Sequence, residues 1–375
     1  MGSSEPVRAM SRWWWAVAGA TLIAGCAFKN NSSGGTDGGS GDDTPCMEGP
    51  LTMKAATLSG CPNEGSIDGP RGTAYFANPV NMKLGASGIA YVADFDSSLV
   101  RRVDTTGTVT TIVKQQGFSL PFGLLVHTNG FLLVETDNDD LGMHTGSTGT
   151  IWQVNPASGA ATVLIRDIGR PRGLAIAPDG TVYTSDYVHH TIGHFDPANA
   201  ATGLMPVAGT MDVEGHVNSN GTTPSTFGQP WDLVMDQNGD LLVAEFDNNV
   251  IRKVIPGAPG KGIVSDFAGT GVAGHVDGPL ATAEFNNPKG IAMDSAGNIY
   301  VSEAGNHDIR KISNGMVTTI AGDGNAGYSD NDDPLQAEFY GVEGLDVSPD
   351  GTRIVVADGN NGDTMAFNHV RVITP

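Results

Sequence analysis

The stretch FNNPKGIAMDSAGNIYVSEAGNHDIRKISNGMVTTIAG, from Phe285 to Gly322, contains four short apolar segments separated by turn residues. GIAMD is followed by the turn SAG, NIYVSE by GNH, and DIRKIS by Asn-Gly before MVTTIAG. Short segments rich in β-branched residues and bounded by Gly, Asn or Asp are typical of strands in hairpins. The stretch therefore predicts a four-stranded antiparallel unit.

The same pattern occurs six times, with copies 42 to 59 residues apart. Four-stranded units that repeat at this period bury their faces by stacking around an axis. We therefore predict an all-β fold, a six-bladed β-propeller of four-stranded antiparallel blades. The first strands begin at NPVNMKLG, LPFGLLV, RPRGLAI, QPWDLVM, NPKGIAM and GVEGLDV, and the second strands end at Asp94, Glu135, Asp186, Glu245, Glu303 and Asp358.

The sixth copy is one strand short, because HVRVITP follows RIVVADGN and ends the sequence. Near the other end of the sequence, residues 52 to 58 match the tail of a repeat. We expect them to supply the outer strand of the last blade, which would join the two ends of the ring and remove an open sheet edge.

The segments AGTGVAGHVDGPLATAEFNNPKGIAMD and YVSEAGNHDIRKI resemble the repeat of the NHL family of propellers. The resemblance covers roughly residues 52 to 375 and implies the propeller fold. The family includes RNA-binding, protein-binding and enzymatic members. Gluconolactonase-like hydrolases and streptogramin-lyase-like enzymes share the architecture, so the resemblance leaves both a binding module and an enzyme open.

The net charge of −21 restricts the classes of partner. A ring this acidic repels phosphate backbones and anionic headgroups, so we expect no nucleic-acid partner.

Residues 1–25 have the build of a signal peptide, with Arg8 and Arg12 before the apolar run WWWAVAGATLIAG. The residues Ile23 to Cys26 resemble a bacterial lipobox, which implies cleavage before Cys26 and lipidation of its sulfur. An ordinary secretory signal is the alternative. Ala27, where some sorting signals have Asp, favours the outer membrane. We expect a lipid-anchored protein of the bacterial cell envelope, with the membrane as a partner.

Residues 26–45 have almost no apolar side chains and are rich in Gly, Ser and Asp, which predicts a disordered tether. The propeller would then occupy residues 46–375. Cys46 and Cys61 are the cysteines left once Cys26 is acylated. Two cysteines in an exported chain usually pair, so we predict a disulfide between them, with two free thiols as the alternative.

The links from outer strand to next inner strand, and those between second and third strands, open on the same face of a propeller. In this chain these links are long, acidic and rich in histidine, whereas the opposite face has compact turns such as PDG and QNG. The acid that ends each second strand occurs in every blade, which favours a structural role. His190 and His307 match each other in the repeat, as do His216 and His275, and no spacing among them indicates a zinc site.

One position near the start of each inner strand varies between the copies and should surround the mouth of the central channel. Aromatic rings and fixed charges there would suit a small-molecule or peptide ligand, although the same side chains could simply fill the mouth. Val80 occupies the position in the first copy. The candidate ligand-binding residues are Phe122, Arg172, Trp231, its neighbour Asp232, Lys289 and Glu343.

We predict no cofactor and no metal, and we assign no catalytic residue. The acidic segments DNDDLG from Asp137 and DNDD from Asp330 leave a loosely built calcium site open, but an EF-hand is excluded because position twelve of the first is Thr148. A gluconolactonase-like metal site would need ligands on inner strands, where Asn81, Asp232 and Glu343 are available.

The sequence therefore predicts a binding module for a small molecule, peptide or protein on the long-looped face. The alternative is a metal-dependent lyase or lactone hydrolase, and a scaffold in an envelope complex is a third reading.

Overall fold

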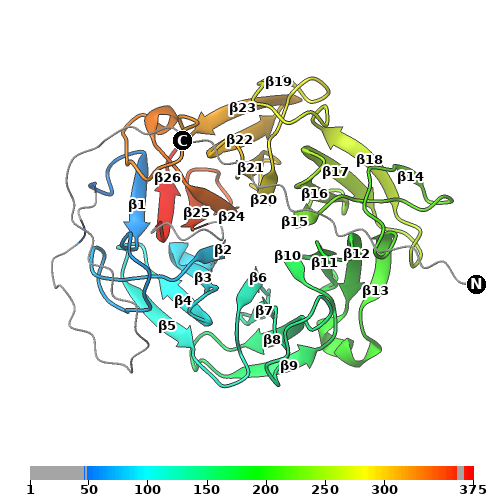
Figure 1. The fold of residues 1–375 in the computed structure, drawn as a ribbon, viewed down its shortest axis with the longest axis horizontal. Helices are drawn as coiled ribbons and strands as arrows, with labels where there is room; N and C mark the ends of the chain where they lie inside the picture. The colour runs from blue at the N-terminus through cyan, green and yellow to red at the C-terminus, as the bar shows by residue number, and fades with distance from the viewer. Residues whose placement is uncertain (1–45, 47–48, 361–366) are drawn as a thin grey trace, which may run out of the picture. The chain divides into compact units, whose positions relative to one another are not determined.

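The computed structural model describes residue 46, residues 49–360 and residues 367–375, which form six antiparallel sheets around an axis (Figure 1). The prediction of an all-β, six-bladed propeller is confirmed. The signal peptide, Cys26 and the tether, predicted for residues 1–45, lie outside the described residues. We number the blades 1 to 6 in the chain order of their inner strands.

Blades 1 to 3 each have four strands, ordered from the axis outward. Blade 1 contains β2 (Pro79–Leu84), β3 (Ala90–Asp94), β4 (Leu99–Val103) and β5 (Val109–Val113). Blade 2 contains β6 (Pro121–Val126), β7 (Leu132–Thr136), β8 (Thr150–Val154) and β9 (Ala161–Ile165). Blade 3 contains β10 (Pro171–Ile176), β11 (Val182–Asp186), β12 (Thr191–Phe195) and β13 (Met205–Gly209).

Blades 4 and 5 each gain a short fifth strand at the outer edge, which the sequence pattern did not predict. Blade 4 contains β15 (Pro230–Met235), β16 (Leu241–Glu245), β17 (Val250–Ile255), β18 (Ile263–Ala268) and the added β14 (Ser219–Asn220). Blade 5 contains β20 (Pro288–Met293), β21 (Ile299–Glu303), β22 (Asp308–Ser313), β23 (Met316–Ala321) and the added β19 (Gly278–Pro279). Three short 3₁₀ segments lie in the described links: η1 (Ala86–Gly88), η2 (Pro197–Thr202) and η3 (Pro334–Gln336).

Blade 6 is completed by a strand from the other end of the chain. It contains β24 (Gly341–Val347), β25 (Ile354–Gly359), β26 (His369–Ile373) and, outermost, β1 (Ala55–Ser59). Ala55 pairs with Ile373 and Thr57 with Arg371 in an antiparallel register. The expected closure is thus confirmed, with the strand beginning slightly later than the predicted residue 52.

Cys46 and Cys61, which flank β1 in the sequence, are joined by a disulfide with 5.7 Å between their Cα atoms. The Cys46 backbone N–H also donates to the Gly72 carbonyl at 2.8 Å. The chain is therefore fixed on both sides of the closing strand.

Four blades contain a buried arginine in the third strand. It bonds the acid that ends the second strand. Arg310 donates to Glu303 at 2.6 Å and to Asp277 at 2.6 Å, and its guanidinium lies 5.4 Å from the ring centre of Phe285. The acid at the end of the second strand therefore has a structural partner in these blades. The equivalent ion pairs are Arg101–Asp94 (3.0 Å), Arg252–Glu245 (2.9 Å) and Arg371–Asp358 (3.1 Å).

Blades 2 and 3 lack this arginine. The position that holds Arg252, opposite Val243, is occupied by Trp152 opposite Val134 in blade 2 and by Gly193 opposite Thr184 in blade 3.

The prediction that Glu135 is the acid that ends the second strand of blade 2 is wrong by one residue, because Thr136 pairs with Pro121 as Glu245 pairs with Pro230. Thr136 accepts from the Trp152 indole N–H at 2.8 Å. In blade 3, Asp186 keeps the acid position and must find another partner, so these two blades differ chemically from the rest of the ring.

No helix among the described residues has the length and apolar character needed to cross a bilayer.

Candidate functional site

Each inner strand begins on the long-looped face, so its second residue lies at the mouth of the central channel. Five of the six predicted site residues meet there. The Arg172 guanidinium lies 4.0 Å from the ring centre of Phe122, and Lys289 Nζ lies 4.6 Å from that of Trp231. Lys289 also pairs with Glu343 at 2.6 Å. Side chains from blades 2 to 6 therefore form one continuous cluster, which we call the mouth cluster.

Three further aromatic residues belong to the mouth cluster, and the sequence analysis did not single them out. Trp231 lies 5.2 Å from both Tyr187 and Phe246 between ring centres, and Phe95 lies 6.0 Å from Phe122. All three directly follow the acid that ends a second strand, in ADFD, SDYV and AEFD. An aromatic residue at that register was therefore the available signal. These rings and Trp231 are only partly buried, whereas Phe122 is buried.

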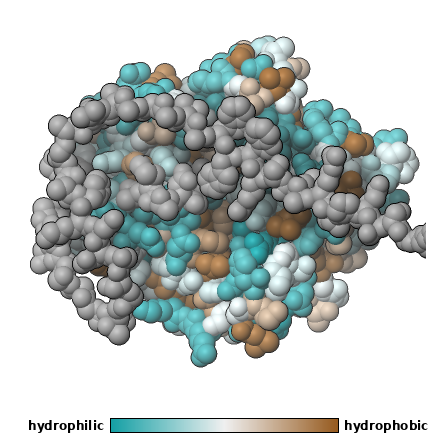
Figure 2. All heavy atoms as spheres, viewed as in Figure 1, coloured by the Kyte–Doolittle hydropathy of each residue, from teal (hydrophilic) through white to brown (hydrophobic). Residues whose placement is uncertain are grey.

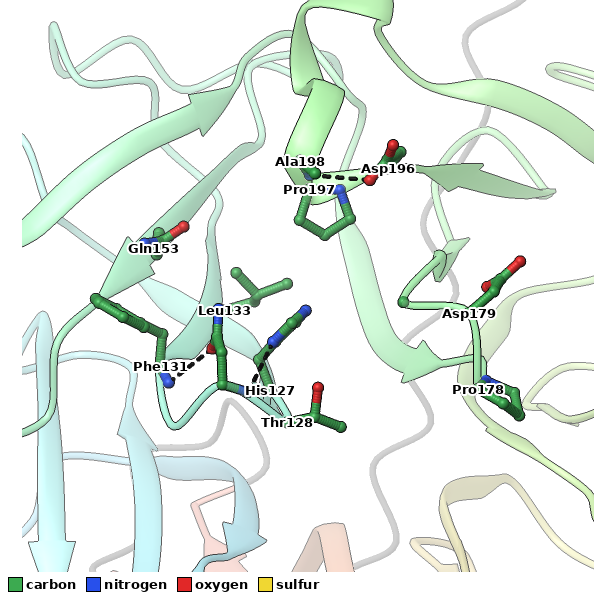
Figure 3. Close-up of a pocket in the computed structure, with 12 residues that line it drawn as sticks. His127, Thr128, Phe131, Leu133, Gln153, Pro178, Asp179, Asp196, Pro197 and Ala198 are labelled. Atoms are coloured by element: carbon green, nitrogen blue, oxygen red, sulfur yellow. Dashed lines mark hydrogen bonds between the residues drawn. The ribbon is translucent and has the colours of Figure 1, made fainter.

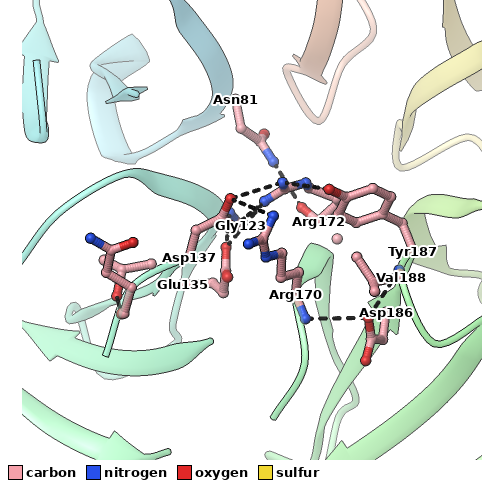
Figure 4. Close-up of polar contacts among 12 residues, drawn as sticks. Asn81, Gly123, Glu135, Asp137, Arg170, Arg172, Asp186, Tyr187 and Val188 are labelled. Atoms are coloured by element: carbon pink, nitrogen blue, oxygen red, sulfur yellow. Dashed lines mark hydrogen bonds and ion pairs between the residues drawn. The ribbon is translucent and has the colours of Figure 1, made fainter. Parts of the chain in front are cut away.

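The two cations of the mouth cluster are each held by a carboxylate. Arg172 donates to Asp137 through two nitrogens, at 2.5 and 3.1 Å, and also to the Tyr187 hydroxyl at 3.4 Å (Figure 4). Burial alone would lower the pKa of Arg172, but the Asp137 charge outweighs it and raises the pKa. The cluster therefore offers rings and fixed dipoles with little net charge.

Glu135 lies beneath this pair and is fully buried. Burial first, and then the neighbouring Asp137 charge, raise the pKa of Glu135 well above its ordinary value. Its Oε2 accepts from the Gly123 N–H at 3.3 Å and lies 3.8 Å from Arg172 Nη1. Because Arg172 is already neutralised by Asp137, we assign Glu135 the protonated form.

Three polar atoms of the mouth cluster have no hydrogen-bond partner among the described residues. They are the indole Nε1 of Trp231, Oε2 of Glu343 and Nε of Arg172, and all three are buried. Buried polar atoms are usually paired, so unpaired ones mark places where a ligand or water would bind. Trp231 and Glu343 both contact Lys289.

The axis is crossed directly below the mouth. Asn81 of blade 1 donates through Nδ2 to the Arg172 carbonyl of blade 3 at 3.3 Å (Figure 4). Below this contact lies a cavity of about 230 Å³ lined by inner-strand residues of all six blades. The Asn81–Arg172 contact therefore ties two inner strands together between the mouth cluster and the lower cavity.

Asp232, the sixth predicted site residue, does not join the mouth cluster. Its Oδ2 lies 3.7 Å from Lys83 Nζ, and its carboxylate accepts from the N–H groups of Leu233 (2.8 Å) and Ile291 (3.3 Å). In four other blades this position is Gly, and a Cβ at Gly173 would meet Asp232 itself at 2.6 Å. The Asp232 carboxylate thus packs where two neighbouring inner strands lie close together.

A depression of about 410 Å³ lies on the opposite face between blades 2 and 3 (Figure 3). Its walls come from compact turns that the sequence analysis assigned only geometric roles. They include His127 and Phe131 of blade 2 and Asp179 and Asp196 of blade 3. Asp196 caps η2 by accepting from the Ala198 N–H at 2.9 Å, so its carboxylate serves the local turn.

The groups that could bind a metal are engaged with other partners. Asp232 and Glu343 each face a lysine, and Asn81 Oδ1 accepts from the Met82 N–H at 2.7 Å. Within the described ranges, no group of three or more His, Cys, Asp and Glu side chains is placed to hold an ion. The residues on the inner strands therefore do not fit the metal site of the alternative prediction.

The acidic segments are bonded within the protein in the same way. Asp140 pairs with Arg166 at 2.6 Å, Asp139 accepts from the Met143 N–H at 2.7 Å, and Asp330 pairs with Arg371 at 3.0 Å. The matched histidines are also used in the repeat. His307 Nδ1 contacts the Tyr340 carbonyl at 2.7 Å, His190 Nδ1 contacts that of Gly228, and His216 and His275 pair with Asp266 and Asp308.

Over the visible part of the face in Figure 2, hydrophobic residues occur in small groups among hydrophilic ones. Scattered exposure of this kind is normal for globular proteins.

The fold and the mouth cluster define a class, that of six-bladed β-propellers with aromatic and charged side chains gathered at the mouth of the central channel. Comparison with known proteins identifies the repeat. The NHL repeat family matches residues 169–195, 227–253 and 285–312, in blades 3, 4 and 5. The chain therefore contains NHL repeats within a six-bladed β-propeller.

The curated relatives are longer than this chain. NHL repeat-containing protein 2 of Bos taurus is 25% identical over 330 residues, which are 80% of this chain and 40% of that protein. The chain thus spans about 40% of the length of that relative.

Among solved structures, an auxiliary nutrient binding protein from Bacteroides ovatus superposes with a TM-score of 0.66 at 22% identity, covering 86% of this chain and 76% of that one. A gluconolactonase from Xanthomonas campestris gives a TM-score of 0.55 at 13% identity, covering 89% and 96%. At these identities the similarity shows the fold alone.

Proposed function

We propose that this protein is a binding module whose ligand binds at the mouth cluster on the long-looped face. The observation that carries the proposal is the mouth cluster. Partly buried rings from several blades surround two neutralised cations, and the Trp231 indole N–H and Glu343 Oε2 lack partners among the described residues. The similarity to a nutrient binding propeller supports the same interpretation.

The chemistry of the mouth cluster favours a small neutral molecule with a ring. Aromatic faces bind the apolar side of such a ring, and fixed donors and acceptors orient its polar groups. A strongly charged ligand would gain less, because Arg172 and Lys289 are already paired with Asp137 and Glu343. Peptide or protein partners that insert a single ring would use the same contacts.

The test is a titration of the purified chain with neutral oligosaccharides and aromatic amino acids, followed by calorimetry and tryptophan fluorescence. We expect at least one probe to bind, and Trp231→Ala to weaken that binding roughly tenfold or more. Trp152→Phe is the matched control, because Trp152 is buried away from the cluster and donates to Thr136 Oγ1 at 2.8 Å. Equal binding by the wild type and Trp231→Ala would reject the proposed site.

The competing function is that of a metal-dependent lactone hydrolase or lyase, because a gluconolactonase has a similar fold. The pairing of Asp232 and Glu343 with lysines argues against its metal site. We expect a chelator to leave the melting temperature unchanged. A stoichiometric divalent ion whose removal lowers the melting temperature would favour the enzyme instead.

We also propose that the protein is exported and held on a bacterial membrane, in our expectation the outer one, through lipidated Cys26. The support is the sequence of residues 1–26. In a bacterial host, Cys26→Ala should move the protein from the membrane fraction to the aqueous one and abolish labelling by a fatty-acid analogue. Retention of the label by the variant would disprove lipidation at this residue.

A further inference from the structure

Blade 3 has an acidic residue whose counterparts in blades 1, 4, 5 and 6 are each paired with an arginine of their own blade. In blades 1, 4, 5 and 6 the acid that ends the second strand pairs with the buried arginine of the third strand. In blade 3 the arginine position is Gly193, and Leu204 packs against it so closely that a Cβ would lie 2.8 Å from Leu204 Cγ. Asp186 therefore has no arginine partner from its own blade.

Asp186 instead holds a histidine. His189 Nδ1 lies 2.5 Å from Asp186 Oδ2, while Oδ1 accepts from the N–H groups of Arg170, Val188 and His189 at 3.1 to 3.2 Å. Because a carboxylate only accepts, Nδ1 carries the proton and Nε2 of the neutral ring presents its lone pair. Both side chains are largely buried.

The repeat explains what is new in this contact. The residue that corresponds to His189 is Asn248 in blade 4 and Asn306 in blade 5, and each donates its amide to the acid of its own blade, at 2.5 and 3.2 Å. Each asparagine also donates to a carbonyl of the preceding link, Asn248 to Gly215 and Asn306 to Gly274, both at 2.9 Å, so its amide has a structural role. The imidazole keeps the bond to the acid and adds a second nitrogen on the opposite side of the ring.

That second nitrogen faces a serine. His189 Nε2 lies 3.5 Å from Ser147 Oγ, and Ser147 is exposed. Ser147 belongs to the link between β7 and β8, residues 137–149, which is much longer than the corresponding links of blades 1, 3, 4 and 5. Two departures from the repeat, an enlarged link in blade 2 and a missing arginine in blade 3, thus meet at one point.

Gly169 allows the three groups to approach. It has a left-handed φ of 78°, and a Cβ there would overlap the Asp186 carboxylate and contact His189 Nδ1. Arg170, the next residue, donates through Nε to the Thr145 carbonyl at 3.1 Å, two residues before Ser147. A guanidinium is thereby attached to the loop that carries the serine.

We infer that Ser147, His189 and Asp186 form a nucleophile, base and positioning carboxylate that hydrolyse carboxylic esters. Ser147 Oγ attacks the acyl carbon as His189 Nε2 takes its proton, which gives a tetrahedral oxyanion. The carbonyl re-forms, and the C–O bond to the alcohol breaks as His189 returns the proton to it. Water then attacks the acyl-serine through the same base, which releases the carboxylic acid and restores Ser147.

The apo separation of 3.5 Å between Ser147 Oγ and His189 Nε2 suits this assignment, because nucleophile–base contacts are often longer before a substrate binds. The site is distinct from the mouth cluster, and its activity does not depend on the ligand proposed there.

The test treats the purified chain with a fluorophosphonate probe, locates the modified residue by peptide mapping, and measures p-nitrophenyl acetate hydrolysis. We expect the probe on Ser147. Ser147→Ala should abolish labelling, and His189→Asn should lower the hydrolysis rate by about 100-fold or more. His189→Asn reproduces the residue found in blades 4 and 5, so it should fold normally.

Ser158→Ala is the matched serine control, because Ser158 is exposed in a turn of the same blade and contacts no histidine among the described residues. It should label and hydrolyse like the wild type. The inference is overturned if the wild type is not labelled, if Ser147→Ala is labelled equally, or if His189→Asn hydrolyses the ester at the wild-type rate.

Discussion

Glu135 and Glu245 are both fully buried, but the strand pairing places them one residue apart in the repeat, because Thr136 pairs with Pro121 as Glu245 pairs with Pro230. Glu245 faces Arg252 at 2.9 Å, with Asn248 and the Gly228 N–H as further donors. The cation that lies 3.8 Å from Glu135, Arg172, is bound to Asp137, and burial raises the pKa of Glu135 well above its ordinary value. The surroundings of a buried acid are therefore set by its partners, which the repeat pattern alone does not specify.

This contrast gives a prediction at single residues. Glu135→Gln should change the free energy of unfolding by less than about 1 kcal/mol, because an amide replaces a protonated carboxyl of the same shape. Glu245→Gln should cost about 3 to 5 kcal/mol, because it leaves the Arg252 charge buried without its main partner. Chemical denaturation of the two variants provides the comparison. Equal losses would show that Glu135 is ionised in the folded protein.

At the scale of the strand, the repeat pattern predicted the fold but did not predict the partners of the acidic residues. The six inner and second strands were predictable because their apolar residues and turn glycines recur in register. The third strands LVRRV, VIRKV, DIRKI and HVRVI share an arginine that TIWQV and TIGHF lack. That difference was readable, but its consequence for Asp186 depends on which side chains meet across a hairpin.

Ser147 shows where sequence reasoning stops. It lies in a link that has no counterpart in the repeat, so no register relates it to His189, 42 residues later. The mouth residues Phe122, Arg172 and Trp231 could be predicted to converge because each begins an inner strand. The pairing of Arg172 with Asp137, which neutralises its charge, could be seen only in the structure.

The final strand, β26, contains a histidine that should make blade 6 sensitive to acid. His369 is buried, stacks on Tyr328 with 5.3 Å between ring centres, and its Nδ1 has no partner among the described residues. Burial first, and the Arg371 charge second, lower the pKa of His369 to about 3. Below pH 6.5, the ordinary pKa of histidine, His369 is protonated in the unfolded chain but stays neutral in the folded chain. The free energy of unfolding therefore falls as the pH falls.

His369→Phe keeps the ring and removes the proton-binding group. Between pH 6.5 and 5 the wild type should lose roughly 2 kcal/mol more unfolding free energy than the variant does. Urea denaturation at the two pH values measures this difference, and other titrating groups cancel because both proteins contain them. A variant with the same pH slope as the wild type would show that His369 is protonated in the folded state.

At the scale of the whole ring, the fold depends on a pairing between residues more than 300 positions apart, Ala55 with Ile373. Such closure removes the exposed edges that a row of blades would otherwise present. Buried apolar contacts repeat around the axis and bind each blade to its neighbours, and Ala55, Ala56 and Leu58 of β1 take part in them. β1 is held in addition by its pairing with β26, by a bridge between Ala55 and Asn331 and by the loop that Cys46 and Cys61 close. The seam is therefore where loss of a cross-link should act first.

We predict that the double variant Cys46→Ser with Cys61→Ala loosens the ring at this seam. The disulfide closes a loop of sequence separation 15, for which the chain-entropy estimate is about 3 kcal/mol. The melting temperature should fall by roughly 5 °C or more. Hydrogen exchange should accelerate in Ala55–Ser59 and His369–Ile373 while strands of blades 3 and 4 keep their protection. A reductant should reproduce the effect in the wild type and leave the double variant unchanged. If exchange instead rose uniformly in all six blades, the ring would open as one cooperative unit and β1 would not be its weakest join.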